Sequence, residues 1–288
     1  MEKTAPSKKN KKSGLLVTVI ILVLIVFWNN FTLKINKQTI TSDKISEQMT
    51  VVVMSDLHYS GVGVGKNKIL KSVKKQKPDL ICVLGDMYSY NSSVETIVKT
   101  VDFCSKLTEN GCPVLFVPGE HDREDFYYDS LRAAGIKVFI NASETITVGK
   151  NTIDVYGISK AYFSPEFTLY KYFARPDGEN LSLFLAHIPM YNYYSEFGAD
   201  LTLCGDTHGG VINLPFIGPV NYNGLWFPEL FNKDENITDK GFFNYKGGTM
   251  FVTSGLGNYV GSTGNTDVDF PMRFNNRPEI AVIKIKPR

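Results

Sequence analysis

The chain of 288 residues is poor in the features that mark several large protein classes. It contains four cysteines and no CxxC pair, so neither a small disulfide scaffold nor a cysteine-based metal site is expected. Its formal net charge of +2 at pH 7 is too small for a strong overall attraction to nucleic acid, and no nucleic-acid partner is expected. Repeats of 20 to 50 residues are absent, and the composition excludes a disordered, collagen-like or coiled-coil chain.

The first 33 residues have the composition of a membrane anchor. Residues 1–12 contain five lysines and one glutamate, and residues 13–33 carry no charge. A helix of that length spans roughly 30 Å, the thickness of the hydrocarbon core. We therefore expect a cytoplasmic basic tail over 1–12, a transmembrane helix over 13–33, and a single-pass protein of the cell membrane whose main domain lies outside the cytoplasm. A cleaved signal peptide is the alternative, although no small-x-small cleavage site follows the apolar run.

Two further features bear on how the chain continues beyond the anchor. Residues 34–48 are polar with mixed charge, which we interpret as a linker before a domain over 49–288. Cys104 and Cys112 lie eight residues apart across the end of a predicted helix. Two alternatives are open for them: a disulfide between the two, or two free thiols.

From residue 50 onward, short apolar runs alternate with amphipathic segments. Apolar runs at 51–54, 80–84 and 114–117 are separated by segments with helical spacing at 66–76 and 94–109, and a further helix is expected over 124–134. This strand-helix-strand rhythm is typical of a parallel sheet, whose strands are covered on both faces. Later runs predict more strands; they lie at 136–140, 144–148, 152–158, 181–186, 200–204, 250–253 and 280–285. The sequence therefore predicts an α/β fold.

Polar clusters containing all four histidines of the chain follow these apolar runs. They are Asp56 with His58, Asp86, Glu120 with His121, His187, and Asp206 with His208. Because ligands bind at the carboxyl ends of the strands in open α/β sheets, we expect these clusters to converge on one edge. Any one of them alone is more typical of a turn or of a hydrogen-bonded core histidine. Together, carboxylates and imidazoles suit divalent ions such as Zn, Mn or Fe.

The ordered motifs resemble those of the calcineurin-like metallophosphoesterase superfamily, in particular its bacterial membrane-anchored branch. They are Asp56-Leu-His58, Gly85-Asp86, Gly119-Glu-His-Asp122, His187 and Gly205-Asp-Thr-His-Gly-Gly210. The resemblance covers residues 50–288 and implies a four-layer α-β-β-α sandwich, here with one N-terminal transmembrane helix. The Gly-Asp-x-x-Asp-Arg-Gly signature of Ser/Thr protein phosphatases is absent, which disfavours protein dephosphorylation.

The resemblance also implies a role for each matching residue. Two divalent metal ions, of which Mn, Zn, Fe and Mg are all candidates, would generate a hydroxide that attacks phosphorus in line. Asp56, His58 and His208 would hold the first ion, and Asp86 would bridge both ions. Glu120, His187 and Asp206 would complete the second. His121 would protonate the leaving oxygen. Asp122 would either orient His121 or cap the helix that follows it.

Two positions depart from the family pattern. Glu120 stands where the pattern has Asn, and Asp206 stands where it has His. Both changes fall on the second predicted ion and replace a neutral ligand by an anion. This favours harder ions such as Mn, Mg or Ca and weakens the attraction for phosphate. Three outcomes are open for the second metal site: it is catalytic with a harder metal, it binds metal weakly, or catalysis is lost.

The resemblance implies hydrolysis of a phosphoester or phosphoanhydride outside the cytoplasm, with a phosphorylated small molecule or a lipid-linked envelope phosphate as substrate. Aromatic residues crowd the segments around His187, where they either form an apolar rim for a lipid tail or pack the core. They are Tyr162, Phe163, Phe167, Tyr170, Tyr172, Phe173, Tyr191, Tyr193 and Tyr194, with Trp226 and Phe227 further along. The alternatives to an enzyme are a non-catalytic domain of the cell envelope that binds metal and phosphate, and a protein-interaction module that needs none of the metal ligands.

Overall fold

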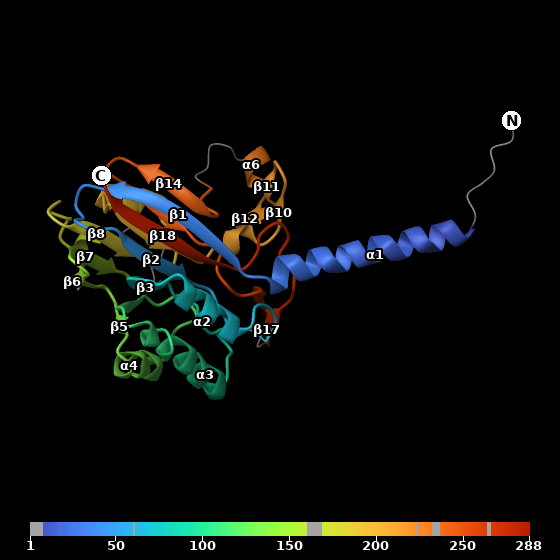
Figure 1. Cartoon of the computed structure of the whole chain (residues 1–288), viewed down its shortest axis with the longest axis horizontal. Helices are drawn as coiled ribbons and strands as arrows, with labels where there is room; N and C mark the ends of the chain where they lie inside the picture. The colour runs from blue at the N-terminus through green and yellow to red at the C-terminus, as the bar shows by residue number, and fades with distance from the viewer. Residues whose placement is uncertain (1–7, 60, 160–168, 223, 232–236, 264–265) are drawn as a thin grey trace.

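Two six-stranded sheets stack face to face in the computed structural model, and a single long helix projects from the body they form (Figure 1). The structure describes residues 8–288 except 60, 160–168, 223, 232–236 and 264–265. Three of the aromatic residues singled out near His187, namely Tyr162, Phe163 and Phe167, lie outside the described residues.

The first sheet contains the predicted strand-helix-strand succession. Its order is β1-β18-β2-β3-β4-β5, in which β2, β3, β4 and β5 run parallel and β18 pairs antiparallel with β2. The strands are β1 (Lys34–Ser42), β2 (Met49–Met54), β3 (Leu80–Val83), β4 (Val114–Phe116), β5 (Lys137–Val138) and β18 (Glu279–Pro287). The connecting helices are α2 (Lys66–Lys75), α3 (Val94–Ser105) and α4 (Asp125–Ala133), and the 3-10 helix η1 (Thr108–Asn110) follows α3.

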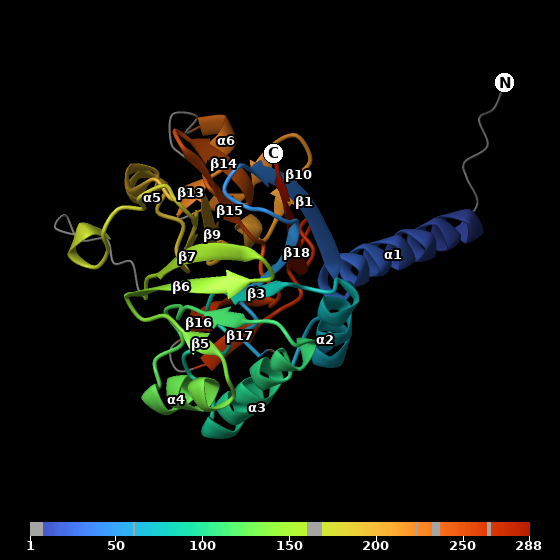
Figure 2. The same ribbon diagram turned by 60° about the vertical axis from the view of Figure 1, so that its left-hand side comes forward.

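The second sheet is built from the later part of the chain in the order β14-β15-β9-β8-β7-β6. Its strands are β6 (Ala142–Val148), β7 (Asn151–Gly157), β8 (Leu181–Leu185), β9 (Leu201–Cys204), β14 (Gly241–Tyr245) and β15 (Gly248–Val252). The 3-10 helix η2 (Leu169–Lys171) and the helix α5 (Tyr191–Phe197) precede and follow β8. Figure 2 shows α2, α3 and α4 on one side of the stacked sheets and α5 on the other.

The segment between β9 and β14 forms small elements rather than a plain loop. They are η3 (His208–Gly210), β10 (Asn213–Leu214), β11 (Gly218–Pro219), β12 (Asn221–Tyr222), β13 (Leu225–Trp226) and α6 (Pro228–Phe231). A further hairpin, β16 (Tyr259–Thr263) with β17 (Thr266–Asp269), lies between β15 and β18.

Three hydrophobic cores hold the four layers together. Successive side chains of a strand point to opposite faces, so Val51 packs between the two sheets while Val52 packs against the helices of the first sheet. On the outer face of the second sheet, Phe184 and Tyr194 belong to the third core. The sequence of layers is therefore helix, sheet, sheet, helix, as predicted.

The projecting helix, α1 (Lys8–Phe31), contains the predicted apolar run. Residues Gly14–Phe31 are long and apolar enough to cross a membrane, and 11% of that window is buried against the rest of the chain (Figure 1). Of the predicted basic tail, residues 1–7 lie outside the described residues and 8–12 begin the helix. Within the described residues there is thus one candidate membrane helix, near the N-terminus.

The interpretation of residues 34–48 as a linker was wrong. Residues Lys34–Ser42 form β1, which pairs in parallel with β18 along its whole length, from Lys34 opposite Glu279 to Ser42 opposite Pro287. The polar composition misled the prediction because β1 is an edge strand, whose outer side chains face water. Its apolar residues Ile35 and Ile40 pack against the cores.

We expect a shortened chain that begins at residue 43 to be markedly less stable than one that begins at residue 33. Loss of β1 removes the contacts that Ile35 and Ile40 make with the cores and exposes the backbone edge of β18, at a cost of about 3 kcal/mol. Thermal unfolding should show the midpoint lowered by roughly 6–12 °C. Equal midpoints for the two chains would show that β1 contributes little to the domain.

The four cysteines form no disulfide. All four are free thiols, and Cys104 is buried with its sulfur 3.8 Å from the Tyr127 hydroxyl. Of the two alternatives for Cys104 and Cys112, the structure has the free thiols.

Candidate metal centre

The polar clusters predicted to meet at one sheet edge do so, because the backbone turns sharply at the end of each strand. Asp56, His58, Asp86, Asp206 and His208 all have positive φ, between 48° and 69°. Non-glycine residues adopt this left-handed conformation infrequently, and it concentrates at functional sites. Here it directs each side chain away from the sheet and into a common space between the carboxyl ends of the two sheets.

Two glycines allow the first sheet's loops to come close enough for this convergence. A Cβ atom on Gly119 would overlap the carboxylate of Asp86, and one on Gly85 would overlap the backbone of Gly119. The two loops therefore pack backbone against backbone beside the Asp86 side chain. The Gly-Asp and Gly-x-His elements of the sequence are thus one structural unit.

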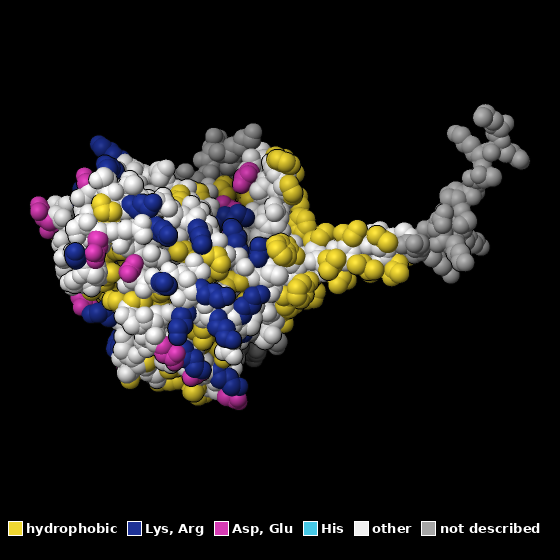
Figure 3. Space-filling model, in the orientation of Figure 1, with side chains coloured by type: hydrophobic (Ala, Val, Ile, Leu, Met, Phe, Trp, Pro, Cys, Tyr) yellow, Lys and Arg dark blue, Asp and Glu magenta, His cyan; other side chains and the backbone are white. Residues whose placement is uncertain are grey.

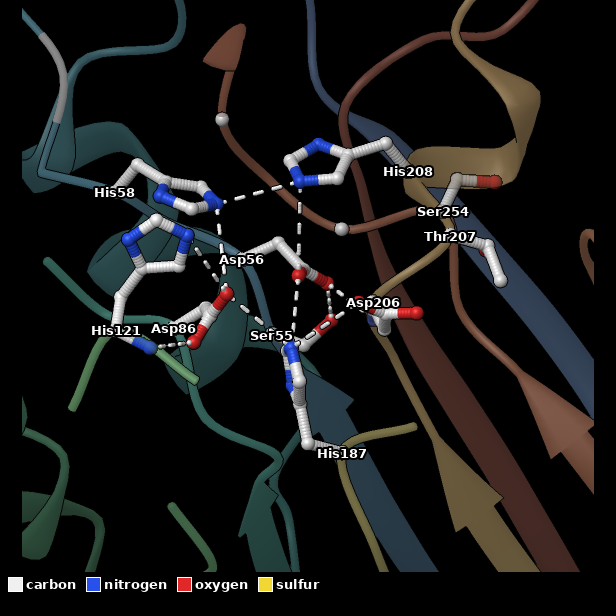
Figure 4. Close-up of polar contacts among 12 residues, drawn as sticks. Ser55, Asp56, His58, Asp86, His121, His187, Asp206, Thr207, His208 and Ser254 are labelled. Atoms are coloured by element: carbon white, nitrogen blue, oxygen red, sulfur yellow. Dashed lines mark hydrogen bonds and ion pairs between the residues drawn. The ribbon is translucent and has the colours of Figure 1, made fainter. Parts of the chain in front are cut away.

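Three carboxylates surround the imidazole of His187 at the centre of the site (Figure 4). His187 Nε2 lies 3.2 Å from Asp86 Oδ2, 3.7 Å from Asp56 Oδ1 and 3.7 Å from Asp206 Oδ1. Asp56 and His187 are buried, and the Ser55 hydroxyl donates to the other oxygen of Asp56. This gathers three carboxylates around one imidazole, two of them buried and the third, that of Asp206, partly exposed.

Two further imidazoles face each other across the same space (Figure 4). His58 Nε2 lies 3.3 Å from His208 Nε2, and His208 Nε2 lies 3.7 Å from Asp56 Oδ1. On its other side, His58 Nδ1 lies 3.2 Å from the Ser89 hydroxyl, which fixes the orientation of the ring. Ring nitrogens and carboxylate oxygens directed at one point are the arrangement that a cation needs.

The donor set fits a metal. Within the described part of the chain, Asp56 Oδ1 and His187 Nε2 are buried polar atoms without a hydrogen-bond partner, although such atoms are nearly always paired. His187 Nδ1 lies 2.6 Å from the Leu84 carbonyl oxygen, so its proton sits on Nδ1 and leaves Nε2 directed into the site. Three groups of potential ligands overlap: Asp56 with His58 and His208, His58 with Asp86 and His121, and Asp56 with Asp86 and His187.

The electrostatics of the centre also favour a cation. Burial, together with the nearby Asp86 and Asp206 charges, raises the pKa of Asp56 to about 7. Burial lowers the pKa of His58 to about 3 and that of His208 well below its usual value, so both rings are neutral, which is the form that binds metal. His187 behaves differently: without a metal, the charges of Asp86 and Asp56 together with the hydrogen bond to Asp86 outweigh its burial and hold its pKa well above the ordinary value. A metal ion bound to Nε2 would have to displace the proton that these carboxylates retain there.

The two residues that depart from the family pattern take different positions. The Asp206 side chain is 32% exposed and lies beside His187. Burial is the main cause that raises the pKa of Asp206, and the nearby charges of Asp86 and Glu120 add to it. Glu120 itself is exposed. Both line a cavity of about 350 Å³ with His58, Asp86, His121, Thr207, His208 and Val211. Asp206 therefore lies among the carboxylates and imidazoles of the site, and Glu120 lies at its solvent-exposed rim.

His121 presents a proton to this cavity. The backbone N–H of Tyr90 donates to His121 Nδ1 over 2.7 Å, which makes Nδ1 the acceptor and leaves the ring proton on Nε2. His121 Nε2 in turn lies 3.7 Å from Asp86 Oδ2, while the His121 backbone N–H donates to Asp86 Oδ1. Sequence reasoning missed the part played by Tyr90 because the contact is made by its backbone.

Asp122 has neither of the two roles predicted for it. Its buried carboxylate accepts hydrogen bonds from the backbone N–H groups of Asp86, Met87 and Gly119, at 2.6, 3.2 and 3.0 Å. The cap position of α4 is occupied by Glu124, and the ring of His121 is oriented by Tyr90. Asp122 therefore fastens the Asp86 loop to the Gly119 loop, which holds both in register beside the ligands.

His208 is supported from the C-terminal part of the chain. Asn276 Nδ2 donates to the His208 carbonyl oxygen over 2.6 Å, and the buried Arg273 guanidinium lies 3.4 Å from His208 Nδ1. Arg273 also donates to the carbonyl oxygens of Ser254 and Gly257. Sequence reasoning missed Arg273, since nothing in the sequence around it indicates a contact with His208.

The comparisons agree with this geometry. A family model for calcineurin-like phosphoesterases matches residues 49–210, more than half of the chain, and the chain belongs to that family. It is 27% identical over 248 residues to the phosphodiesterase YaeI of Escherichia coli, covering 82% of this chain and 81% of the relative. Two metallophosphoesterases are similar to it to a comparable degree: YkuE of Bacillus subtilis, 24% identical with 82% and 78% covered, and one of Aquifex aeolicus, 26% identical with 89% and 93% covered.

Proposed function

We propose that the chain is a metal-dependent hydrolase of phosphoesters or phosphoanhydrides, held in the membrane by α1 with its domain outside the cytoplasm. The observation that carries the proposal is the pair of unpartnered buried atoms, Asp56 Oδ1 and His187 Nε2, directed at one space beside the Nε2 proton of His121. Family membership supports the phosphoester chemistry. The candidate span in α1 supports the anchor, and the lysine-rich segment before it supports the orientation.

The residues divide into those that would hold metal and one that would handle the proton. Asp56, His58 and His208 would hold one ion, Asp86 would lie between two ions, and His187 with Asp206 would hold the second, with Glu120 available at the rim. When bound, divalent ions supply positive charge to the phosphate oxygens and lower the pKa of water. His121 holds its proton at Nε2, within reach of an oxygen that leaves phosphorus. Asp122 and Tyr90 keep Asp86 and His121 in place.

Metal analysis of the full chain in detergent tests the proposal directly. Hydrolysis of bis(p-nitrophenyl) phosphate, p-nitrophenyl phosphate and a pyrophosphate ester should be measured with Mn, Zn, Fe and Mg. We expect bound metal and turnover with at least one ion, with diesters and monoesters distinguished by their relative rates. Tight binding of phosphate with no turnover under any ion would instead support a non-catalytic metal- and phosphate-binding domain.

We expect the double exchange Glu120→Asn with Asp206→His to shift metal preference toward Zn and Fe, because an imidazole and an amide replace two anionic oxygens. The single exchange Asp206→His should account for most of the shift, since Asp206 lies beside His187 whereas Glu120 is at the rim. Metal content by mass spectrometry and turnover with each ion measure the effect. If the double variant keeps metal content, preference and rate all unchanged, these two residues are not ligands.

A further inference from the structure

A second cavity, of about 450 Å³, lies where α1 meets the domain. One wall comes from the last turns of α1, with Ile25 and Trp28, and another comes from the start of β1, with Lys34. Pro215, Lys240 and Arg277 close it from the domain side. The cavity therefore combines apolar side chains of the candidate membrane helix with three basic side chains of the domain.

The basic side chains are only partly compensated by acidic ones. Lys34 pairs with the buried carboxylate of Glu279 at 3.0 Å. Lys240 is half-buried, and burial lowers its pKa most. The charges of Asp239 and Glu279 raise this pKa, whereas those of Lys34 and Arg273 lower it. The pKa of Lys240 remains below its ordinary value despite these acids, so an anion bound in the cavity would stabilise its charged form.

Arg277 is held in position to contribute to such a site. Its guanidinium stacks on the Trp28 ring, 4.3 Å from the ring centroid, and its Nη2 donates to the Leu33 carbonyl oxygen over 2.8 Å. Among the described residues, its Nε is buried without a hydrogen-bond partner. The stacking on Trp28 and the bond to Leu33 thus hold the Arg277 charge at the wall of the cavity, and a guanidinium held in this way loses little further side-chain freedom when it contacts a phosphate.

The cavity lies at the level where lipid headgroups would be. The candidate span ends at Phe31, so Lys34 and the side chains around it follow the helix end directly. Figure 3 shows hydrophobic side chains gathered on the edge of the domain from which the helix emerges. Next to the cavity residue Pro215, Phe216 is fully exposed, and Phe274, which also lines the cavity, is 37% exposed. Trp28, in the last turns of α1, is also exposed, and tryptophan near the end of a membrane helix is typical of the membrane interface.

We infer that this cavity binds the headgroup phosphate of an anionic phospholipid in the leaflet next to the domain. Lys240 and Arg277 would contact the phosphate, and Ile25 with Trp28 would contact the glycerol and upper acyl chain. The inference rests on the membrane anchor of the proposed function. None of the residues that line this cavity is a predicted metal ligand, although Asn276 both lines it and donates to the His208 carbonyl oxygen.

Titration of the full chain in detergent with phosphatidylglycerol and phosphatidylcholine, followed by native mass spectrometry, tests the inference. We expect the wild-type chain to prefer phosphatidylglycerol and the Lys240→Gln/Arg277→Gln variant to bind it about thirtyfold more weakly, since each basic side chain near an anionic lipid contributes roughly fivefold. Lys284→Gln/Lys286→Gln removes the same charge from the exposed far end of β18 and should leave binding unchanged.

Three outcomes would overturn the inference. One is equal binding by the wild-type and double variants, and another is an equal loss in the far-end control. The third is displacement of the lipid by glycerol phosphate at matched concentration, which would identify a soluble phosphate as the ligand. Because Arg277 also contacts α1, Lys240→Gln alone is measured as well, and it should weaken binding about fivefold. Phosphodiester hydrolysis and resistance to alkaline extraction from membranes, measured on the same samples, report separately on the proposed function.

Discussion

Asp86→Asn should lose most of its bound metal and at least about 10³-fold in kcat/KM. The Asp86 carboxylate lies within 4.0 Å of ring nitrogens of His58, His121 and His187, so it takes part in more of these contacts than any other carboxylate of the centre. An amide keeps the size of the side chain but removes its charge, and the charge that metal ions bring to a phosphate is worth several kcal/mol. Metal content and turnover should fall together.

Asp129→Asn is the matched control for this variant. Asp129 is exposed on α4 and pairs with Arg132 three residues further along the helix. It should keep full metal content and rate. If the Asp86→Asn chain retains its metal content and its rate, Asp86 is not a ligand of the centre. If this chain also retains its biological role, the protein is better described as an interaction module.

His121→Asn should keep its metal and lose about 10²–10⁴-fold in kcat on substrates with alkyl leaving groups, the usual range for loss of a general acid. The loss should be much smaller on p-nitrophenyl esters, because that leaving group departs without a proton. The ratio of the two losses therefore measures proton donation by His121 Nε2 and separates it from a loss of binding.

A different result would give His121 a different role. His121 also lies close enough to His58 and Asp86 to form a ligand group with them. If His121→Asn lost metal in parallel with activity, and to the same degree for both kinds of leaving group, His121 would be a metal ligand rather than the proton donor.

Sequence patterns predicted the part of this molecule that depends on strand ends. Fully apolar runs identified β2, β3 and β4, and the rule that carboxyl ends of parallel strands meet at one edge brought Asp56 and Asp86 together. Asp56 and His187 are indeed buried at the same edge of the structure. The direction of a strand determines where the chain leaves the sheet. The position of the residue that follows the strand can therefore be predicted from the strand alone.

Contacts made by backbone groups, or between distant segments, could not be predicted in the same way. The orientation of His121 depends on the Tyr90 N–H, which every residue type except proline would offer. Asp122 binds three backbone groups that no motif distinguishes. The strand β1 was mistaken for a linker because its pairing with β18 joins the two ends of the domain, and an edge strand does not have the continuous apolar pattern of a central one.

The junction between α1 and the domain has a consequence for where the protein can work. Asn30, fully buried in the last turn of α1, exchanges hydrogen bonds with the backbone of Arg273, 243 residues away, and β1 begins three residues after the helix ends. The domain is thus fixed rigidly to the end of α1, with no flexible linker between them. In the proposed orientation the metal centre would keep one height and one direction relative to the bilayer, which would favour substrates that present their phosphate at that height.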